Sequence, residues 1–269
     1  MREAEILALS ADACALRDAT AHAAERVALP ADRANWPAAV FGPRAGEPAS
    51  AGGAATLTQA FTRFGAGAAP FDLLLADSAV KFFVVTPPQG LQRFTELHDL
   101  AALRLEELFG TDSAAWRISA DWNSRQPFLC CAAANELLAP LEAFAGARLR
   151  SAAPNFVRRF NAAAASFGRK PAWFVCSVGG WVSAAYFDAG ACHCVRSTAL
   201  PQPEALARWL GHEALLANRP LGLVHLVTDQ EALTIPGANV QRVATSARDL
   251  RELQLLAALA PNSPTPVAA

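Results

Sequence analysis

The chain of 269 residues lacks any excess of charge, because 23 lysines and arginines stand against 24 aspartates and glutamates and the net charge is −1. Nucleic-acid-binding proteins need a basic surface that neutralises phosphates, so this balance argues against a nucleic-acid partner. The nearest approach to a basic cluster is spread over residues 148–170, which is typical of a solvated helix face. We therefore expect no nucleic-acid partner.

Long apolar runs are also missing, although hydrophobic residues make up 53% of the chain. No segment reaches the ~18 uninterrupted apolar residues of a membrane span. The start, MREAE, is acidic and is followed by only a short apolar run, unlike a secretory signal. We expect no membrane span and a cytoplasmic location. The six cysteines lie almost all in apolar, strand-like segments, which is typical of reduced core residues.

The residues that are present predict an organisation that repeats once. Each half is expected to open with three strands, continue with a helix and return to a strand. In the first half we expect strands at 6–9, 13–16 and 27–29, a helix at 56–64 and a strand at 71–75. In the second half we expect strands at 172–178, 181–188 and 192–197, a helix at 204–216, strands at 221–227 and 240–243, and a last helix from Ser246, capped with Asp249, to Ala258.

The middle of the chain predicts a further set of elements between these halves. A strand at 80–85 is followed by an amphipathic helix at 94–109, which Gly110 is expected to cap. Strands at 117–121 and 128–133 come next, and then a helix at 135–144 that Pro140 is expected to break or offset. A longer helix at 154–167 has Pro154 in its first turn.

Four stretches carry strands and helices in an order that also occurs in a known protein family. They are FDLLLADSAVKFFVVTPPQG with the acidic helix ELHDLAALRLEELFG, then PFLCCAAANELLAPLEAFAGARLRSAAPNFVRRFN, then PAWFVCSVGGWVSAAYFDAGACHCVRS, and the closing strand and helix. In this order the chain resembles the PilM and GspL type of actin-like platform protein, from type IV pilus and type II secretion machines. The resemblance covers most of the chain, but it consists of apolar strand patterns, not of rare residues.

The resemblance implies an α/β, two-lobed actin-like fold related to ribonuclease H. The first lobe would span residues 1–153, with an inserted α+β subdomain at about 86–146. Residues 154–260 would form the connecting helix and the second lobe, which lacks its outer subdomain. Residues 261–269 are rich in Pro, Ala and Ser and are expected to be a disordered tail.

An actin-like nucleotide site needs two turns that offer backbone N–H groups to phosphate, and an acidic residue that holds Mg²⁺. In the first hairpin, Ala8 stands where the acid belongs and Ser10 stands where the glycine belongs; Asp12 is interpreted as a turn residue. The first hairpin therefore departs from the pattern, and the second hairpin, described next, also lacks the acidic residue.

In that second hairpin, FVCSVGGWVSAAYFDAG, Ser177 replaces the acid while Gly179 and Gly180 are kept, and Trp181 would crowd an approaching phosphate. The third element, TDQE at 228–231, has no glycine. We therefore expect no ATP or Mg²⁺ cofactor, no catalytic residue and no enzymatic activity. An ATP-binding, sugar-kinase-like member of the same superfamily is the alternative.

The cluster Cys192-His193-Cys194 allows a second alternative, a zinc-binding α/β module, because thiolate and imidazole are zinc ligands. Alternation along a strand would place both cysteines on one face and the histidine on the other. No second ligand pair of the usual spacing follows, so ordinary core and surface positions are the preferred interpretation and no metal is expected.

The resemblance implies a cytoplasmic scaffold that binds the cytoplasmic segment of a single-span inner-membrane protein and is thereby held peripherally at the membrane. It leaves open a contact with the assembly ATPase and a homodimer. The region chosen for the partner is the strand at 80–85 with the helix at 96–109. The candidate residues within it are Val80, Phe82, Val84, Leu97 and Leu105.

Overall fold

The computed structural model describes residues 5–9, 13–17, 25–28, 71–91, 93–145, 148–200, 202, 204–229 and 234–259. Three of our expectations concern residues outside these ranges: the turn residues Ser10 and Asp12, the helix at 56–64 and the tail at 261–269.

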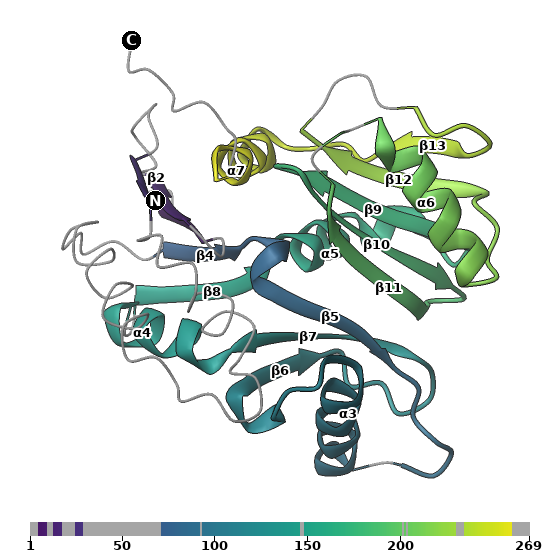
Figure 1. Ribbon diagram of the computed structural model, residues 1–269, viewed down its shortest axis with the longest axis horizontal. Coiled ribbons are helices and arrows are strands. Elements are labelled where there is room, and N and C mark those ends of the chain that lie inside the picture. The colour runs from purple at the N-terminus through teal and green to yellow at the C-terminus, as the bar shows by residue number, and fades with distance from the viewer. Residues whose placement is uncertain are drawn as a thin grey trace.

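The first lobe is built on a five-stranded sheet in the order β3-β2-β1-β4-β8. Strands β4 and β8 of this sheet lie side by side in Figure 1. Its strands are β1 (Glu5–Leu9), β2 (Ala13–Arg17), β3 (Glu25–Ala28), β4 (Phe71–Leu75) and β8 (Leu149–Pro154). The first three form an antiparallel meander, and β4 and β8 continue the sheet in parallel.

The second lobe repeats this plan in the order β11-β10-β9-β12-β13. Its strands are β9 (Ala172–Val178), β10 (Trp181–Asp188), β11 (Ala191–Ala199), β12 (Leu223–Thr228) and β13 (Asn239–Arg242). A meander again opens the sheet, and β12 and β13 follow in parallel. Between β11 and β12 the described chain holds one regular element, helix α6 (Ala205–Leu216), and no outer subdomain.

A third sheet, β5-β7-β6, lies between β4 and β8 in the chain and forms the insertion. Its elements are η1 (Asp77–Ala79), β5 (Val80–Val85), α3 (Phe94–Phe109), η2 (Ser113–Ala115), β6 (Trp116–Ala120), β7 (Phe128–Ala134) and α4 (Asn135–Ala145). The boundary that we placed near residue 86 falls at the end of β5. Because β5 pairs with β7, the insertion extends back to η1.

Two helices tie the lobes together, because each follows one sheet and packs against the other. Helix α5 (Asn155–Phe167) leaves the first lobe and packs against β9, whereas α7 (Ala247–Ala258) leaves the second lobe and packs against β1. One core, the interlobe core, therefore runs from the first lobe through the insertion to the inner face of the second sheet. A separate core, the α6 core, lies between the outer face of that sheet and α6.

The local signals for two helix ends are confirmed. Gly110 has a φ of 61° in the left-handed region, and its N–H donates to the Glu106 carbonyl over 2.8 Å. At the start of α7, the Asp249 N–H donates to the Ser246 hydroxyl over 3.1 Å, and the Ser246 N–H donates back to the Asp249 carboxylate over 3.0 Å. Both caps depend on neighbouring residues alone, which is why the sequence predicts them well.

Strand β8 was not predicted. The segment LRSAAP contains few residues that favour strands, and we read residues 154–167 as the next element. Parallel pairing with β4 makes the segment a strand, so tertiary contacts override its weak propensity. Pro154 then ends β8 and stands before the first residue of α5 rather than inside the first turn of the helix.

The expected effect of Pro140 was wrong, because α4 continues through it from Asn135 to Ala145. A proline within a helix loses one backbone hydrogen bond and crowds the preceding turn. On the same helix, Leu137 and Leu138 are buried in the interlobe core. This packing holds the helix together despite the proline. None of the described helices is long and apolar enough to cross a membrane.

Candidate functional site

The turn between β9 and β10 keeps the shape of a phosphate-binding hairpin. Gly179 and Gly180 have φ values of 60° and 75°, and both lie in the left-handed region that two-residue hairpins require. The Gly179 N–H donates to the Asp229 carboxylate over 3.0 Å. The backbone group that a phosphate would use is therefore already bound by a carboxylate of the chain itself.

Sequence reasoning missed this role of Asp229, which we noted only as part of a segment without glycine. The signal was its position directly after β12. Since β12 runs parallel to β9 and Thr228 lies opposite Ser177, both strands end at the same edge of the sheet. Ser177 itself is half-buried in β9. In the first lobe, Ala8 is fully buried in β1, so at that position the chain presents a methyl group inside the core.

The Trp181 ring does not lie over the glycine turn, which corrects our expectation that it crowds a phosphate there. Its Nε1–H donates to the Ser197 hydroxyl on β11 over 2.6 Å, and Ser197 bonds in turn to Ser183 over 2.7 Å. This chain of hydrogen bonds holds the indole across β11, away from the turn. Trp181 thereby becomes part of a different surface, described below.

The arrangement of Cys192, His193 and Cys194 was also predicted wrongly. A bulge places Cys194 opposite Tyr186 and Cys192 opposite Phe187, so the alternation shifts by one residue. Cys192 packs into the interlobe core, and Cys194 packs against the α6 core on the other face. Burial raises the pKa of both thiols. In the described part of the chain, no three His, Cys, Asp or Glu side chains gather as a metal site requires.

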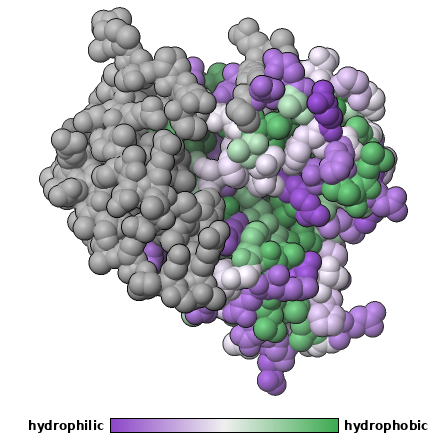
Figure 2. Space-filling model, viewed as in Figure 1, coloured by the Kyte–Doolittle hydropathy of each residue, from purple (hydrophilic) through white to green (hydrophobic). Residues whose placement is uncertain are grey.

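A groove of about 700 Å³ lies between the insertion and the second lobe. We call it the β5–β11 groove, because its walls are β5, the last turn of α3, Trp181 and residues 193–197 of β11. Strands β5 and β11 are each at the edge of their sheet, so both present an unpaired edge. Figure 2 shows hydrophobic side chains gathered in the hollow between these two parts of the molecule.

The structure separates the five partner-binding candidates into two groups. Val80, Phe82 and Val84 belong to β5 and line the β5–β11 groove, although Val80 and Phe82 are only 6% and 7% exposed. Leu97 and Leu105 are 3% and 0% exposed in the core beneath α3, so they support the helix and are not accessible to a partner. The periodicity that identified them marks the buried face of an amphipathic helix. The sequence could not identify β11, which forms the opposite wall of the groove.

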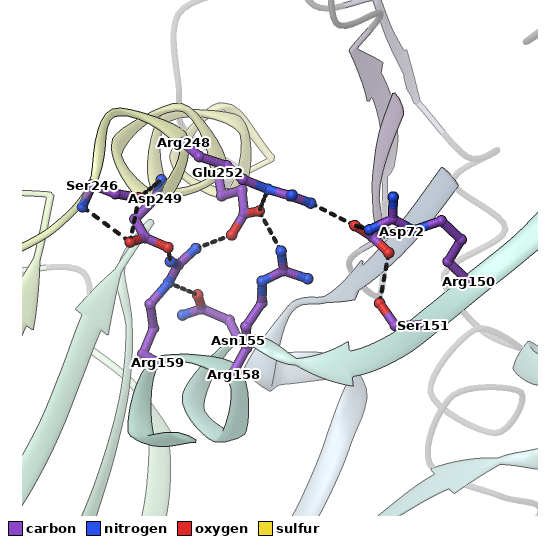
Figure 3. A network of polar contacts seen from close by, with 10 residues as sticks. All are labelled: Asp72, Arg150, Ser151, Asn155, Arg158, Arg159, Ser246, Arg248, Asp249 and Glu252. Carbon is purple, nitrogen blue, oxygen red and sulfur yellow. Dashed lines mark hydrogen bonds and ion pairs between the residues drawn. The ribbon is translucent and has the colours of Figure 1, made fainter. Parts of the chain in front are cut away.

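A buried polar network joins the lobes (Figure 3). Its centre is Glu252 of α7, which is 0% exposed and accepts hydrogen bonds from Arg158 at 2.7 Å, Arg248 at 3.1 Å and Arg159. Arg159 is 2% exposed and also binds Asp249. Buried charges of this kind are stable only when they are paired, so the network holds α5 and α7 in one arrangement.

The network reaches the first sheet through Asp72 of β4. This carboxylate accepts hydrogen bonds from Ser151 at 2.7 Å, Arg150 at 3.3 Å and Arg248. Burial pushes the pKa of Asp72 up, but the Ser151 hydroxyl and the two arginines outweigh burial and leave it lowered. Through Arg248, α7 of the second lobe is therefore tied to β4 of the first.

Asp77 lies where the insertion, α5 and the second lobe meet. Its buried carboxylate accepts the Phe156 N–H over 2.8 Å near the start of α5. Burial raises its pKa to about 7, against the hydrogen bonds of Phe156, Ser183 and Asn155 and the charge of Arg159, which lower it. The carboxyl group thus takes up a proton at a pH where an exposed aspartate is fully charged.

We expect this proton to make folding stability depend on pH. The ordinary pKa is 3.8 and the folded pKa is about 7, so between these values the folded state holds a proton that the unfolded state has lost. The contribution of this proton to the free energy of unfolding is complete below pH 3.8 and is lost as the pH rises through 7. The slope is at most about 1.4 kcal/mol per pH unit. Urea unfolding of Asp77→Asn from pH 4 to 8 should lack this slope.

The matched control for this experiment is Asp99→Asn, on the exposed face of α3. It should unfold with the same pH dependence as the unaltered protein. If Asp77→Asn also keeps the full slope, the carboxyl group of Asp77 does not take up the proton.

No model of a known protein family and no curated protein matches this sequence. In structure, the chain is similar to the cytoplasmic domain of EpsL, an inner membrane component of the type II secretion system of Vibrio cholerae. The TM-score is 0.52 and the identity 13%, over 93% of this chain and 94% of that chain. A chain of the PilM–PilN type IV pilus biogenesis complex gives a TM-score of 0.57 and 15% identity, over 96% and 95%.

A protein of Bacteroides thetaiotaomicron with an actin-like ATPase fold and unknown function is similar as well, with a TM-score of 0.52 and 9% identity over 89% of this chain and 91% of that chain. At such identities the likeness establishes the fold. The repeated sheet order, the exchanged helices and the insertion agree with it. The chain is therefore a two-lobed α/β protein of actin-like fold, and the resemblance to PilM and GspL type proteins is confirmed at the level of that fold.

Proposed function

We propose that the chain is a non-catalytic platform protein of a bacterial pilus or secretion machine. It binds a short cytoplasmic segment of a single-span inner-membrane protein in the β5–β11 groove. The observation that carries this proposal is the groove itself, which two sheet-edge strands line together with apolar side chains. Extended peptides bind such edges through main-chain hydrogen bonds, while their side chains fill adjacent pockets.

The likeness to EpsL and to a chain of the PilM–PilN complex supports this role, because both belong to assemblies of this kind. In this proposal the protein is cytoplasmic and reaches the inner membrane through its partner. A contact with the assembly ATPase and a homodimer are further parts of the proposal.

The proposal includes the loss of nucleotide binding. An actin-like nucleotide site needs free N–H groups in its turns, and the Gly179 N–H is occupied by Asp229. A phosphate at this turn would also meet the negative charge of that carboxylate. We propose that neither ATP nor Mg²⁺ is a cofactor and that the turn serves the fold alone.

Co-purification from detergent-solubilised membranes of the native host tests the proposal. The unaltered protein should recover a single-span inner-membrane protein with a cytoplasmic segment, identified by mass spectrometry. Val84→Arg, which places a charged side chain on the β5 wall, should reduce that recovery at least about ten-fold. Leu215→Arg changes a leucine of α6 that is 83% exposed, outside the groove lining, and should recover the same partner undiminished.

Two results would contradict the proposal. One is recovery of a soluble metabolic enzyme without any single-span membrane protein. The other is a saturable rise in the melting temperature with Mg²⁺ and ATP, which would instead support the ATP-binding alternative.

A further inference from the structure

We propose that the β5–β11 groove selects an extended segment that carries a carboxylate between apolar residues, and that Lys81 is the group that recognises the carboxylate. This inference rests on the proposed function and adds the chemistry of the segment. It follows from the charges on the walls, the position of the Lys81 ammonium group and the edge of β11.

The described residues that line the groove are cationic, apolar or polar without a negative charge. Lys81, Arg104 and Arg196 contribute positive charge, and none of the lining residues is an aspartate or glutamate. Arg104 already pairs with Glu107 of its own helix, and Arg196 pairs with Glu213 over 3.3 Å. Of the three cations, Lys81 is the one that forms no ion pair with a described residue. The walls are therefore complementary to a negatively charged segment.

The Lys81 ammonium group is held in place by two aromatic rings. Its Nζ lies 4.3 Å from the centre of the Trp116 ring and 4.7 Å from that of Phe109. The Trp116 indole is fixed by a 2.9 Å hydrogen bond from its Nε1 to the Thr111 hydroxyl. Cation–π contacts of this kind orient an ammonium group and leave its N–H donors available. The site is thus preorganised before a ligand arrives.

The half-buried position of Lys81 explains why an added carboxylate would matter. Burial lowers its pKa to about 8, because the charged form is poorly hydrated there. A carboxylate from a partner would supply the countercharge that these walls lack. Because the pair would be partly shielded from water, its energy should exceed that of an exposed surface pair.

The neighbouring surface accommodates apolar residues on either side of the carboxylate. Leu108 and Phe109, at the end of α3, are 45% and 39% exposed. Trp181 contributes its ring from the opposite wall, where its hydrogen bond to Ser197 holds it. A free anion such as phosphate would use the cations but not these apolar surfaces, so the groove fits a peptide better.

The edge of β11 can bind the main chain of that peptide. The Leu200 N–H donates to the Gly180 carbonyl, and Ser183 lies opposite Ser197. In an antiparallel pair, hydrogen-bonded residues alternate with residues whose backbone groups point to the other side. The backbone groups of Val195 and Ser197 therefore point away from β10, toward the side on which β5 packs beside β11. The Val195 carbonyl accepts the Arg196 guanidinium there over 2.9 Å.

The test is a selection of random ten-residue peptides displayed on phage, against the full chain and its variants. Peptides enriched on the unaltered protein should carry Asp or Glu flanked by apolar residues. Lys81→Met removes the charge at similar volume and should abolish this preference, and Lys81→Glu should reverse it toward Lys or Arg. Leu215→Arg is the matched surface control and should select the same acidic peptides as the unaltered protein.

A synthetic peptide of the enriched consensus is then measured by fluorescence anisotropy. Lys81→Met should weaken its binding at least about ten-fold, whereas Lys81→Arg keeps the charge and should retain most of the affinity. Thermal melts check each variant; Lys81→Met should fold, because it removes a charge that is poorly hydrated.

The outcomes separate this inference from the proposed function. If peptides bind and Val84→Arg abolishes their binding, but neither an acidic preference nor a dependence on Lys81 is found, the inference fails while the groove remains a peptide site. If selection on the unaltered protein enriches no peptide beyond those enriched on the Val84→Arg variant, the inference fails too. The membrane co-purification then decides on the proposed function. If the groove instead holds a second copy of the chain, Val84→Arg will change the oligomeric state, which also overturns the inference.

Discussion

Replacing Glu252 with glutamine is expected to destabilise the folded protein by about 3–5 kcal/mol, the range measured when one partner of a buried ion pair is removed. The carboxylate is 0% exposed and accepts hydrogen bonds from Arg158, Arg159 and Arg248. Without its charge, Arg159 remains buried with only Asp249 to balance it. Urea unfolding followed by circular dichroism measures the loss.

The control for Glu252→Gln is Glu142→Gln, which removes the charge from an ion pair with Arg117 in which both side chains are about half exposed. Exposed pairs contribute little, so this variant should lose less than about 1 kcal/mol. A similar loss of stability in both variants would show that the ion pairs of Glu252 contribute no more than an exposed pair does. In the double variant Arg159→Met, Glu252→Leu, apolar packing replaces the buried pair, and part of the lost stability should return.

The position of this network bears on the proposed function. Glu252 joins α5 to α7, and Arg248 extends the connection to Asp72 in the first lobe. Opening or closing the two lobes would have to break these buried ion pairs. A platform protein needs a fixed surface and no closing cleft, so a network that holds both lobes together suits the role proposed above.

Replacing Phe156 with alanine is expected to cost about 3–5 kcal/mol, because it leaves a large cavity in a packed core. Phe156 is 0% exposed, and its ring lies 5.4 Å from that of Phe82 and 5.2 Å from that of Phe174. These three rings come from α5, the insertion and the second lobe. The cavity should therefore weaken the junction of all three parts, and thermal unfolding measures the effect.

The control for Phe156→Ala is Leu215→Ala, at a leucine that is 83% exposed. Such surface changes usually lie within about 0.5 kcal/mol. Because Phe82 also lines the β5–β11 groove, Phe156→Ala should weaken partner binding as well as stability. Stability close to that of the control would mean that the three parts do not share one core.

Elements with strong local patterns were predicted almost to the residue. Residues 94–109 form α3 because leucines and alanines recur on one face and Gly110 ends it. Strands β4 and β5 have the predicted bounds, since each is a short apolar run between turn residues. The capping pair Ser246 and Asp249 needs only a helix to follow it. In each case the information lies within a few neighbouring residues.

Elements that depend on distant partners were missed or misread. Strand β8 exists because β4 offers it a parallel edge. The bulge at His193 places the two cysteines beside it on opposite faces of the sheet, and no local sequence pattern predicts that bulge. Leu97 and Leu105 were chosen as partner residues from their helical spacing, but spacing does not distinguish a face that packs on the chain's own sheet from one that binds a partner.

By itself, the sequence determined the repeated order of strands and helices, because that order depends on residue types and their local spacing. Through the resemblance it also indicated the class of fold and the departures of both hairpins from the phosphate-binding pattern. Only the tertiary structure decided which surface is available for binding. Folding brings the edges of β5 and β11, more than a hundred residues apart in the chain, to two sides of one groove. It also places Asp229 on the Gly179 N–H and buries Glu252 among three arginines, since contacts between distant segments are set by packing and not by local pattern.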